Sequence, residues 1–278
     1  MSQSTVTRPV GVEELQRAWH ALQDGQFRAR PTRGPQTTAR RAAPPTSTWS
    51  PTEPVLPVLG CIGQAGATTV AVAIATVTGS ARVLECASAS ASGLAAAATA
   101  EHGRSANAWS LGRRERVWLA RAGDLLIAPD ETPVPDEPPV PVDLTILDVG
   151  WETGQVMASR GWIRHQLATL TTLVVVTSPT VPGLRRLETA LRLLAPARGV
   201  IAVLGPQPRR WPSNLTASLG PLASAALKEQ RVVALPTDKG LALRGLDATP
   251  LPTSLLKAAE TILQRTAAAD TPQEGQPE

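Results

Sequence analysis

A glycine-rich segment in the first third of the chain has the composition of a phosphate-binding loop. It separates an apolar run typical of a β-strand from an alanine- and valine-rich run typical of a helix. Phosphate binding requires backbone N–H groups at a helix N-terminus and glycines where side chains would block the anion. Gly63 and Gly66 meet the second requirement, and Thr68 and Thr69 open the helix. The segment that we expect to contact a phosphate reads Ile62-Gly63-Gln64-Ala65-Gly66-Ala67-Thr68-Thr69.

Other reactive side chains do not form a recognisable site. His20, His102 and His165 are far apart in the sequence and no nucleophile accompanies them, so we expect no catalytic triad. Cys61 and Cys86 fall within predicted buried strands. We expect both to be small core residues rather than a disulfide or a metal pair.

Composition narrows the class of protein. The chain has 278 residues, 42% of them hydrophobic, which is enough for a sizeable core. A net charge of +4 is low for a general nucleic-acid binder. No secretory signal is visible and no apolar run approaches the roughly 20 residues of a membrane span, so we expect a cytoplasmic protein. Tryptophans are expected in packing, except Trp211, which with Arg209 and Arg210 forms a candidate contact loop.

The remaining elements must position the glycine-rich loop. Strand-like and helix-like runs alternate along residues 55–266, which indicates a parallel sheet with helices on both faces. We predict a P-loop NTPase-like α/β domain there, built on one doubly wound, mostly parallel sheet. Its expected strands are 55–62, 82–86, 116–120, 125–128, 144–149, 172–177, 200–204 and 231–235. A helix after the loop ends near 77, and further helices are expected at 92–101, 154–170, 181–194, 219–229 and 253–266.

The two ends of the chain read differently. Residues 1–54 are predicted to form a disordered arm with one short amphipathic helix at about 11–25 and an Arg/Pro-rich linker. The basic run from Arg28 to Arg41 is expected to be solubilising, or to contact nucleic acid or an anionic surface weakly. Residues 267–278 are predicted to be a disordered tail. The apolar side chains expected to bind a protein partner, or to pack on the chain's own domain, are Leu15, Trp19, Leu22 and Phe27.

In this setting the loop resembles that of the MinD/ParA group of P-loop ATPases, which reads Lys-Gly-Gly-x-Gly-Lys-Thr-Thr. The likeness continues in order along residues 55–266. Leu144–Gly150 is similar to the group's strand Ile-Ile-Ile-Asp-x-Pro-x-Gly, and Val174–Pro179 to its Val-Val-Thr-x-Pro-Glu turn. Val232–Asp238 is similar to the strand that ends in Ile-Pro-x-Asp. The resemblance implies ATP and Mg²⁺ as ligands, with Thr68 and Asp148 near the metal and Asp148 beside the attacking water.

The chain also departs from the group's pattern. Ile62 stands in place of the signature lysine and Ala67 in place of the Walker lysine. Gly205 replaces the asparagine that reads adenine, and Glu85-Cys86-Ala87 replaces an acidic Asp-x-Asp stretch. Loss of fixed cations removes electrostatic stabilisation on which phosphoryl transfer depends. The loss of the signature lysine also argues against the ATP-sandwich dimer of active relatives.

These departures predict a non-hydrolysing scaffold or adaptor in a localisation, partition, secretion or mobile-element transfer system, in which Asp148 is vestigial. A weakly active ATP-binding ATPase of the same group is the first alternative. A dinucleotide-binding oxidoreductase is a second, because Gly60, Gly63 and Gly66 have Gly-x-x-Gly-x-x-Gly spacing and Glu85 could hold a ribose hydroxyl. Such enzymes use a catalytic tyrosine, and this chain has none.

Overall fold

The computed structural model describes residues 48–270. Several predictions lie outside these residues: the helix at about 11–25 with its apolar side chains, the basic run Arg28–Arg41 and the tail beyond residue 270. In the described part of the chain, none of the helices combines the length and the apolar character that a membrane span requires.

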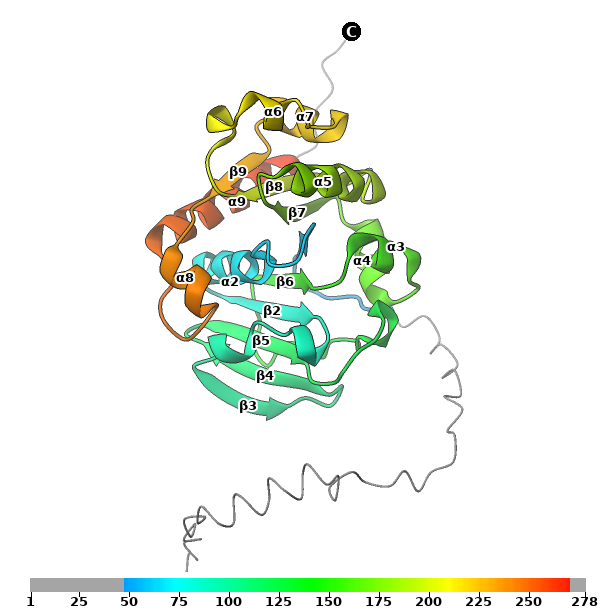
Figure 1. Ribbon diagram of the computed structural model, residues 1–278. Helices are drawn as coiled ribbons and strands as arrows, with labels where there is room; N and C mark the ends of the chain where they lie inside the picture. Colours follow the sequence, from blue (N-terminus) through cyan, green and yellow to red (C-terminus); the bar gives the residue numbers. More distant parts are fainter. Residues whose placement is uncertain (1–47, 271–278) are drawn as a thin grey trace, which may run out of the picture. The chain divides into compact units, whose positions relative to one another are not determined.

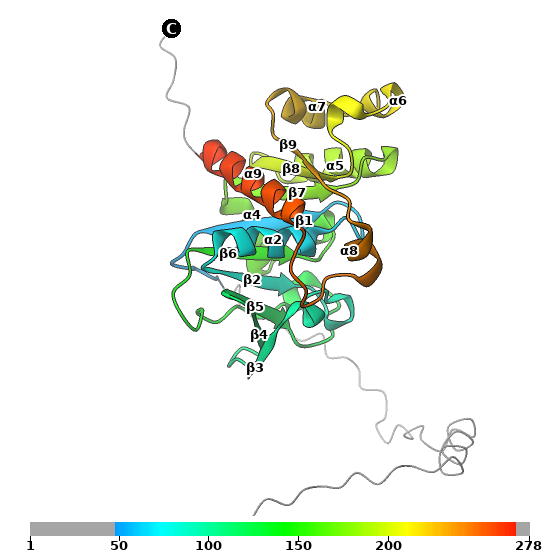
Figure 2. The same cartoon turned by 90° about the vertical axis from the view of Figure 1, so that its left-hand side faces the viewer.

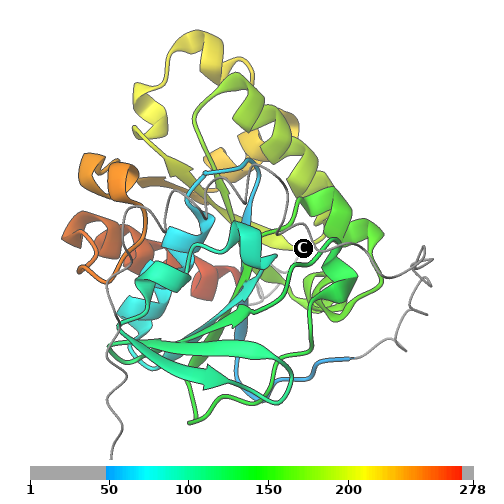
Figure 3. The same cartoon turned by 60° about the horizontal axis from the view of Figure 1, so that its bottom comes forward.

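One sheet of nine strands organises the described residues, in the order β3-β4-β5-β2-β6-β1-β7-β8-β9 (Figure 1). Each neighbouring pair in the part of the sheet β5-β2-β6-β1-β7-β8-β9 is parallel. The pairs β3–β4 and β4–β5 are antiparallel and form one margin, which Figure 3 turns toward the viewer. The strands are β1 (Val55–Gly60), β2 (Ala81–Cys86), β3 (Ala100–Arg104), β4 (Trp109–Arg114), β5 (Val117–Ala122), β6 (Leu144–Val149), β7 (Thr172–Thr177), β8 (Arg198–Leu204) and β9 (Val232–Leu235).

Helices cover both faces of the sheet, as predicted. α2 and α9 pack on one face, and α4, α5 and α7 on the other (Figures 1 and 2). Short 3₁₀ turns lie at Ala89–Ala91, Ala95–Ala97, Pro129–Glu131 and Pro208–Arg210. The α-helices are α2 (Ala67–Thr78), α3 (Thr153–Ala158), α4 (Trp162–Thr169), α5 (Val181–Leu193), α6 (Ser213–Thr216), α7 (Pro221–Lys228), α8 (Lys239–Arg244) and α9 (Thr253–Asp270).

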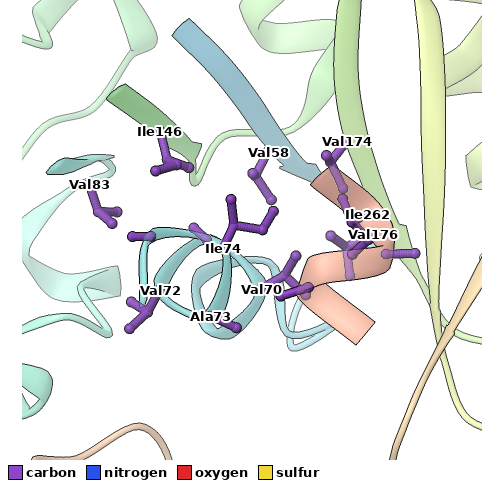
Figure 4. Packing of buried hydrophobic residues seen from close by; sticks show 14 of the residues in the cluster. Val58, Val70, Val72, Ala73, Ile74, Val83, Ile146, Val174, Val176 and Ile262 are labelled. Atoms are coloured by element: carbon purple, nitrogen blue, oxygen red, sulfur yellow. The ribbon is translucent and has the colours of Figure 1, made fainter. Parts of the chain in front are cut away.

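Central strands bury side chains on both faces, which explains why they read as continuous apolar runs. In β6, Ile146 faces the α2 side of the sheet and Leu147 faces the α5 side. Ile74 of α2 points toward Val58, Ile146 and neighbouring strand residues, and Ile262 of α9 lies by β7 (Figure 4). Alanines at alternate positions of α2 are fully buried, so this helix approaches the sheet closely.

The strongest apolar runs were predicted correctly, whereas three weaker segments were not. Residues 92–101 do not form the predicted helix but a 3₁₀ turn and the start of β3. Residues 125–128 are not a strand, and Leu125 and Ile127 are exposed there. The helix expected at 154–170 is divided into α3 and α4, because the backbone is extended at Ser159, the C-cap of α3, and at Gly161, the N-cap of α4.

Ordered structure extends a few residues past each predicted domain boundary. The folded part begins before residue 55, because the Trp49 side chain is buried and its carbonyl accepts a 2.6 Å hydrogen bond from Gln166 Nε2. Trp49 also packs edge-on against Trp162, with ring centroids 5.1 Å apart. At the other end α9 continues to Asp270, beyond the predicted boundary at 266. Trp49 therefore belongs to the core, whereas the other residues from 48 to 54 are exposed or half-buried.

The strand order contradicts the dinucleotide-binding alternative. In the Rossmann fold the first two strands are neighbours, which brings an acidic residue of the second strand to the ribose. Here β1 lies between β6 and β7, and β6 separates it from β2. Glu85 of β2 therefore lies beside Asp148 of β6, not beside β1.

Candidate functional site

The turn from β1 to α2 forms an open cradle. Gly66 adopts a left-handed conformation (φ 89°) and serves as the N-cap of α2 without any side-chain cap. Its carbonyl accepts a 2.9 Å hydrogen bond from Val70 N, which starts the helix. Apart from the residues adjacent in sequence, nothing lies within 4 Å of where a Cβ would stand at Gly63 or Gly66. The first-turn amides of α2 have no partner within the helix and face this open space, as an anion site requires.

A cavity of about 550 Å³ adjoins the cradle. The loop forms one wall, and the end of β6 with the residues that follow it forms another. The Gly93 segment and Arg186 of α5 complete the lining. All of the sequence-predicted contact residues from Gly63 to Thr69 line this space together with Asp148, so the structure brings the predicted set together.

Asp148 is the most unusual group in the cavity. Its side chain is 1% exposed, and neither carboxylate oxygen has a hydrogen-bond partner among the described residues. Burial raises the pKa of Asp148 to about 7; the nearby Thr68 hydroxyl lowers it and the Glu85 charge raises it further. Thr68 is thus close enough to act on the charge without forming a hydrogen bond of ordinary geometry. Such a carboxylate is open to a proton or a cation.

Glu85 is buried like Asp148 but its carboxylate is occupied. It accepts hydrogen bonds from Gly93 N at 2.6 Å and Leu94 N at 3.2 Å, and from the Ser92 hydroxyl. These bonds hold the segment after β2 over the cavity, where a Cβ at Gly93 would lie 3.4 Å from Thr68 Cγ2. Glu85 therefore shapes the wall of the cavity and is not free to bind a ribose.

Residues 62–69 of the loop carry no charged side chain. Ala67 is the first residue of α2, and the Ile62 side chain packs against the core on the α2 face of the sheet. Among the described residues that line the cavity, Arg186 has the only basic side chain. Arg186 lies in α5, a helix capped at its N-terminus by Thr180, whose hydroxyl accepts a 3.1 Å hydrogen bond from Gly183 N. Sequence analysis did not single out Arg186.

Cys61 lies at the base of the loop and is buried. Burial raises the pKa of its thiol to about 12; the Arg186 charge lowers it and the Glu152 charge raises it. A thiol that stays protonated is neither a nucleophile nor a metal ligand. Both Cys61 and Cys86 are free and buried, as predicted. The described residues hold no cluster of three or more His, Cys, Asp or Glu side chains that could bind a metal.

A second cavity, of about 610 Å³, lies on the other side of the loop. It shares Gln64, Gly66 and Thr69 with the first and is closed by α8, a helix that sequence analysis missed. Asp238 of the predicted Pro236-Thr237-Asp238 turn caps α8, accepting a 2.7 Å hydrogen bond from Leu241 N. Its carboxylate is therefore engaged in structure.

Comparison with solved structures identifies the architecture. The cell division ATPase MinD of Pyrococcus furiosus matches with a TM-score of 0.50 at 15% sequence identity, over 76% of this chain and 99% of that one. The chain has a MinD/ParA-type P-loop fold. The MinD cell division protein of Aquifex aeolicus (TM-score 0.46, 14% identity, 81% and 99% covered) and a ParA family ATPase of Chlorobium tepidum (0.42, 12%, 77% and 92%) are also similar. No protein-family model matches the sequence, and comparison with curated proteins gives no match.

In this fold the predicted residues from Gly63 to Thr69 and Asp148 line one cavity. The loop follows the central strand β1, Asp148 is the penultimate residue of the neighbouring strand β6, and Thr68 lies in the first turn of α2. Backbone amides, one hydroxyl and one unpartnered carboxylate therefore converge on one cavity. What the arrangement lacks is a cation in the loop itself.

Proposed function

We propose that this protein is a scaffold or adaptor of the MinD/ParA type that does not hydrolyse ATP. One observation supports the proposal: in the glycine turn between β1 and α2, Ala67 and Ile62 stand where the loop of the MinD/ParA group has its two lysines. A fixed cation at the loop neutralises charge that develops during phosphoryl transfer. Without it, the loop serves to join β1 to α2, and the protein acts through partners in localisation, partition, secretion or mobile-element transfer.

The ligand set of a Mg²⁺–nucleotide complex is present in part. If ATP binds, the amides of residues 63–69 would hold its phosphates, and Thr68 with Asp148 would hold Mg²⁺. The open cradle at Gly66 and the unpartnered oxygens of Asp148 support this assignment. The uncharged loop opposes it. Weak ATP binding, with or without slow turnover, is therefore the second candidate function, and the free carboxylate of Asp148 is the observation that favours it.

Calorimetric titration with Mg-ATP and a phosphate-release assay, both on the full chain, test the proposal. We expect no release above the buffer rate and weak binding at most. An Ala67→Lys variant should gain affinity because the lysine supplies the missing charge, whereas Ala67→Met, of similar length, should not. Tight binding by the parent chain, with phosphate release that Asp148→Asn abolishes, would contradict the scaffold function.

We also propose that the amino-terminal segment recruits the partner, through Leu15, Trp19, Leu22 and Phe27, and that Arg28–Arg41 adds a weak, salt-sensitive contact to an anionic surface. Deletion of residues 1–27 should leave the melting temperature of the protein unchanged if this segment binds in trans. A large loss of thermal stability would show that it packs on its own domain.

We further propose that the chain does not form the ATP-sandwich dimer of active relatives, because Ile62 stands in place of the signature lysine. The chain should therefore sediment as the same species with and without Mg-ATP.

A further inference from the structure

Strand β9 forms one margin of the sheet and has a free edge. Ile201 N donates to the Arg231 carbonyl at 2.8 Å and Gly205 N to the Leu235 carbonyl at 3.0 Å, so these residues of the β9 segment face β8. Backbone groups alternate in direction along a strand, so Val232 and Ala234 turn their N–H and C=O groups outward. An edge of this kind is a template for pairing with another strand.

The outward face of β9 opens on a groove of about 750 Å³. The loop after β8 forms one side of it and α9 the other; Figure 2 shows β9 and α9 side by side. Arg209, Arg210, Lys257 and Arg265 all line the groove. Among the described residues that line it there is no carboxylate, so the groove favours anionic side chains.

The loop 205–210 is held in place by Trp211. Its Nε1 donates to the Pro206 carbonyl at 2.9 Å, and its ring packs against the core on the α5 side of the sheet. Trp211 is thus not the exposed contact residue considered from the sequence. It anchors a loop from which Arg209 and Arg210 extend, both exposed.

Arg265 of α9 already donates hydrogen bonds to outward-facing backbone carbonyls at the β9 edge. Its Nη1 donates to the Val232 carbonyl at 2.7 Å and also to the Gln230 carbonyl. A side chain therefore already satisfies one outward carbonyl of β9. The Val232 N–H and both Ala234 groups are left for an incoming backbone.

We propose that this groove binds an extended acidic segment of a partner protein, which adds as a further strand beside β9. Backbone hydrogen bonds to Val232 and Ala234 would supply affinity, and carboxylates placed against Arg209, Arg210 and Lys257 would supply specificity. A second copy of this chain fits poorly, because two such edges would bring like charges together. The inference rests on the proposed adaptor function and adds a second partner surface to the amino-terminal segment, but it does not depend on whether ATP is hydrolysed.

The test uses a fluorescein-labelled, end-blocked peptide in which glutamates alternate with valines, titrated with the full chain and followed by anisotropy. Arg209→Glu/Arg210→Glu should weaken binding at least tenfold, equivalent to about 1.4 kcal/mol. Arg164→Glu/Arg185→Glu makes the same charge change at exposed positions of α4 and α5 and should have no effect. Replacing the glutamates of the peptide by lysines should abolish binding.

Variants at Ala234 distinguish strand addition from simple charge attraction. Ala234→Pro removes the outward N–H at a position where an edge strand tolerates proline, and should weaken binding at least roughly tenfold. Ala234→Ser keeps the N–H and should bind like the parent. If Ala234→Pro does not fold, a peptide N-methylated at its strand-facing amides makes the same test on the parent chain, and it should not bind.

Three outcomes would overturn the proposal. Equal binding of the N-methylated peptide or by Ala234→Pro would show that no strand forms. Binding of a short DNA duplex, lost in Arg209→Glu/Arg210→Glu, without binding of the acidic peptide would assign the groove to nucleic acid. A dimer of the chain alone that Ala234→Pro dissociates would assign it to a second copy. Phosphate release, measured separately, decides the scaffold function whichever result is found.

Discussion

Glu85 and Asp148 lie opposite each other on the neighbouring strands β2 and β6, both buried, yet only Glu85 has hydrogen-bond partners. The two carboxylates share one low-dielectric region and repel each other. The protein resolves the conflict by giving backbone amides to Glu85 and leaving Asp148 to be neutralised. In a MinD/ParA-type fold this second position faces the phosphate loop, so the neutralising group is either a proton or a bound cation.

Asp148 should make stability depend on pH. Its pKa is about 7 in the folded protein against 3.8 for an ordinary aspartate, so the folded state holds a proton that the unfolded state has released. The contribution of Asp148 to the free energy of unfolding is therefore largest below about pH 4 and declines as the pH rises to 7. The loss is on the order of 4 kcal/mol.

Urea unfolding of the parent and of Asp148→Asn at pH 5 and pH 8 measures this effect. The asparagine variant should lose less stability between the two values than the parent does. Asp143→Asn, at an exposed position, is the matched control and should keep the parent's dependence. Parallel pH profiles for parent and Asp148→Asn would show that Asp148 is ionised in the folded protein.

Glu85 should fasten the segment that covers the cavity. Glu85→Ala leaves the Gly93 and Leu94 amides without their acceptor, which costs about 1–3 kcal/mol at the buried Leu94 and less at the exposed Gly93, whose amide can bond to water. Hydrogen exchange should speed up at these two amides, and Glu85→Gln, which keeps one carbonyl oxygen, should show a smaller change. Unaltered exchange at Gly93 in the alanine variant would mean that the segment is held by other contacts.

Strands β6 and β7 could be predicted to the residue because burial on both faces leaves continuous apolar sequences, Leu144–Val149 and Thr172–Thr177. The helix predicted at 92–101 was wrong because contacts with a residue outside the segment determine its conformation. Its alanines favour a helix in isolation, but Glu85 draws its backbone amides into the wall of the cavity. The Glu85 carboxylate, seven or more residues earlier in the chain, determines the conformation of this segment, so the sequence of the segment alone cannot predict it.

Some residues of the candidate site could likewise be predicted from local sequence patterns, and others could not. The loop 62–69 was predictable because glycine spacing between a strand and a helix is a local signal, and Asp148 because it ends an apolar strand in a familiar order. Arg186 was not, since it reaches the cavity only through the packing of α5 beside a loop more than 100 residues earlier in the sequence. Trp49 and Glu53 were assigned to the arm because proline-rich sequence surrounds them, although both pack into the folded part.

A buried ion pair holds that first segment. Arg82 Nη2 lies 2.6 Å from Glu53 Oε1, with both side chains less than a tenth exposed, and Arg82 Nε donates to the Thr145 hydroxyl at 2.7 Å. Arg82→Met should cost about 3–5 kcal/mol, because it leaves the Glu53 charge buried and unpaired. Adding Glu53→Gln should recover part of the loss, so the double variant costs less than the sum of the single ones.

Urea unfolding of the four proteins of this cycle measures the coupling. The exposed pair Arg104–Asp124, 3.2 Å apart, is the control, and Arg104→Met should cost less than about 1 kcal/mol. Additive losses at Arg82 and Glu53 would contradict the coupling.

Arg186 should be the cation on which any phosphate ligand of the cavity depends. It extends from α5 into the lining, and its charge already acts on Cys61 at the base of the loop. With Ala67 and Ile62 uncharged, it is the only basic group of the described residues that a bound anion would meet there. Arg186→Glu should therefore lower the affinity for Mg-ATP at least roughly tenfold.

The neighbouring Arg185 is exposed, lies on the same helix and does not line the cavity, so Arg185→Glu changes the net charge equally and should bind like the parent. Calorimetric titrations of the three proteins make the comparison. Because the parent binds weakly at most, the same pair is also measured in the Ala67→Lys background, where the restored lysine raises affinity. Equal effects of the two glutamate variants in both backgrounds would reduce Arg186 to a long-range contribution to net charge.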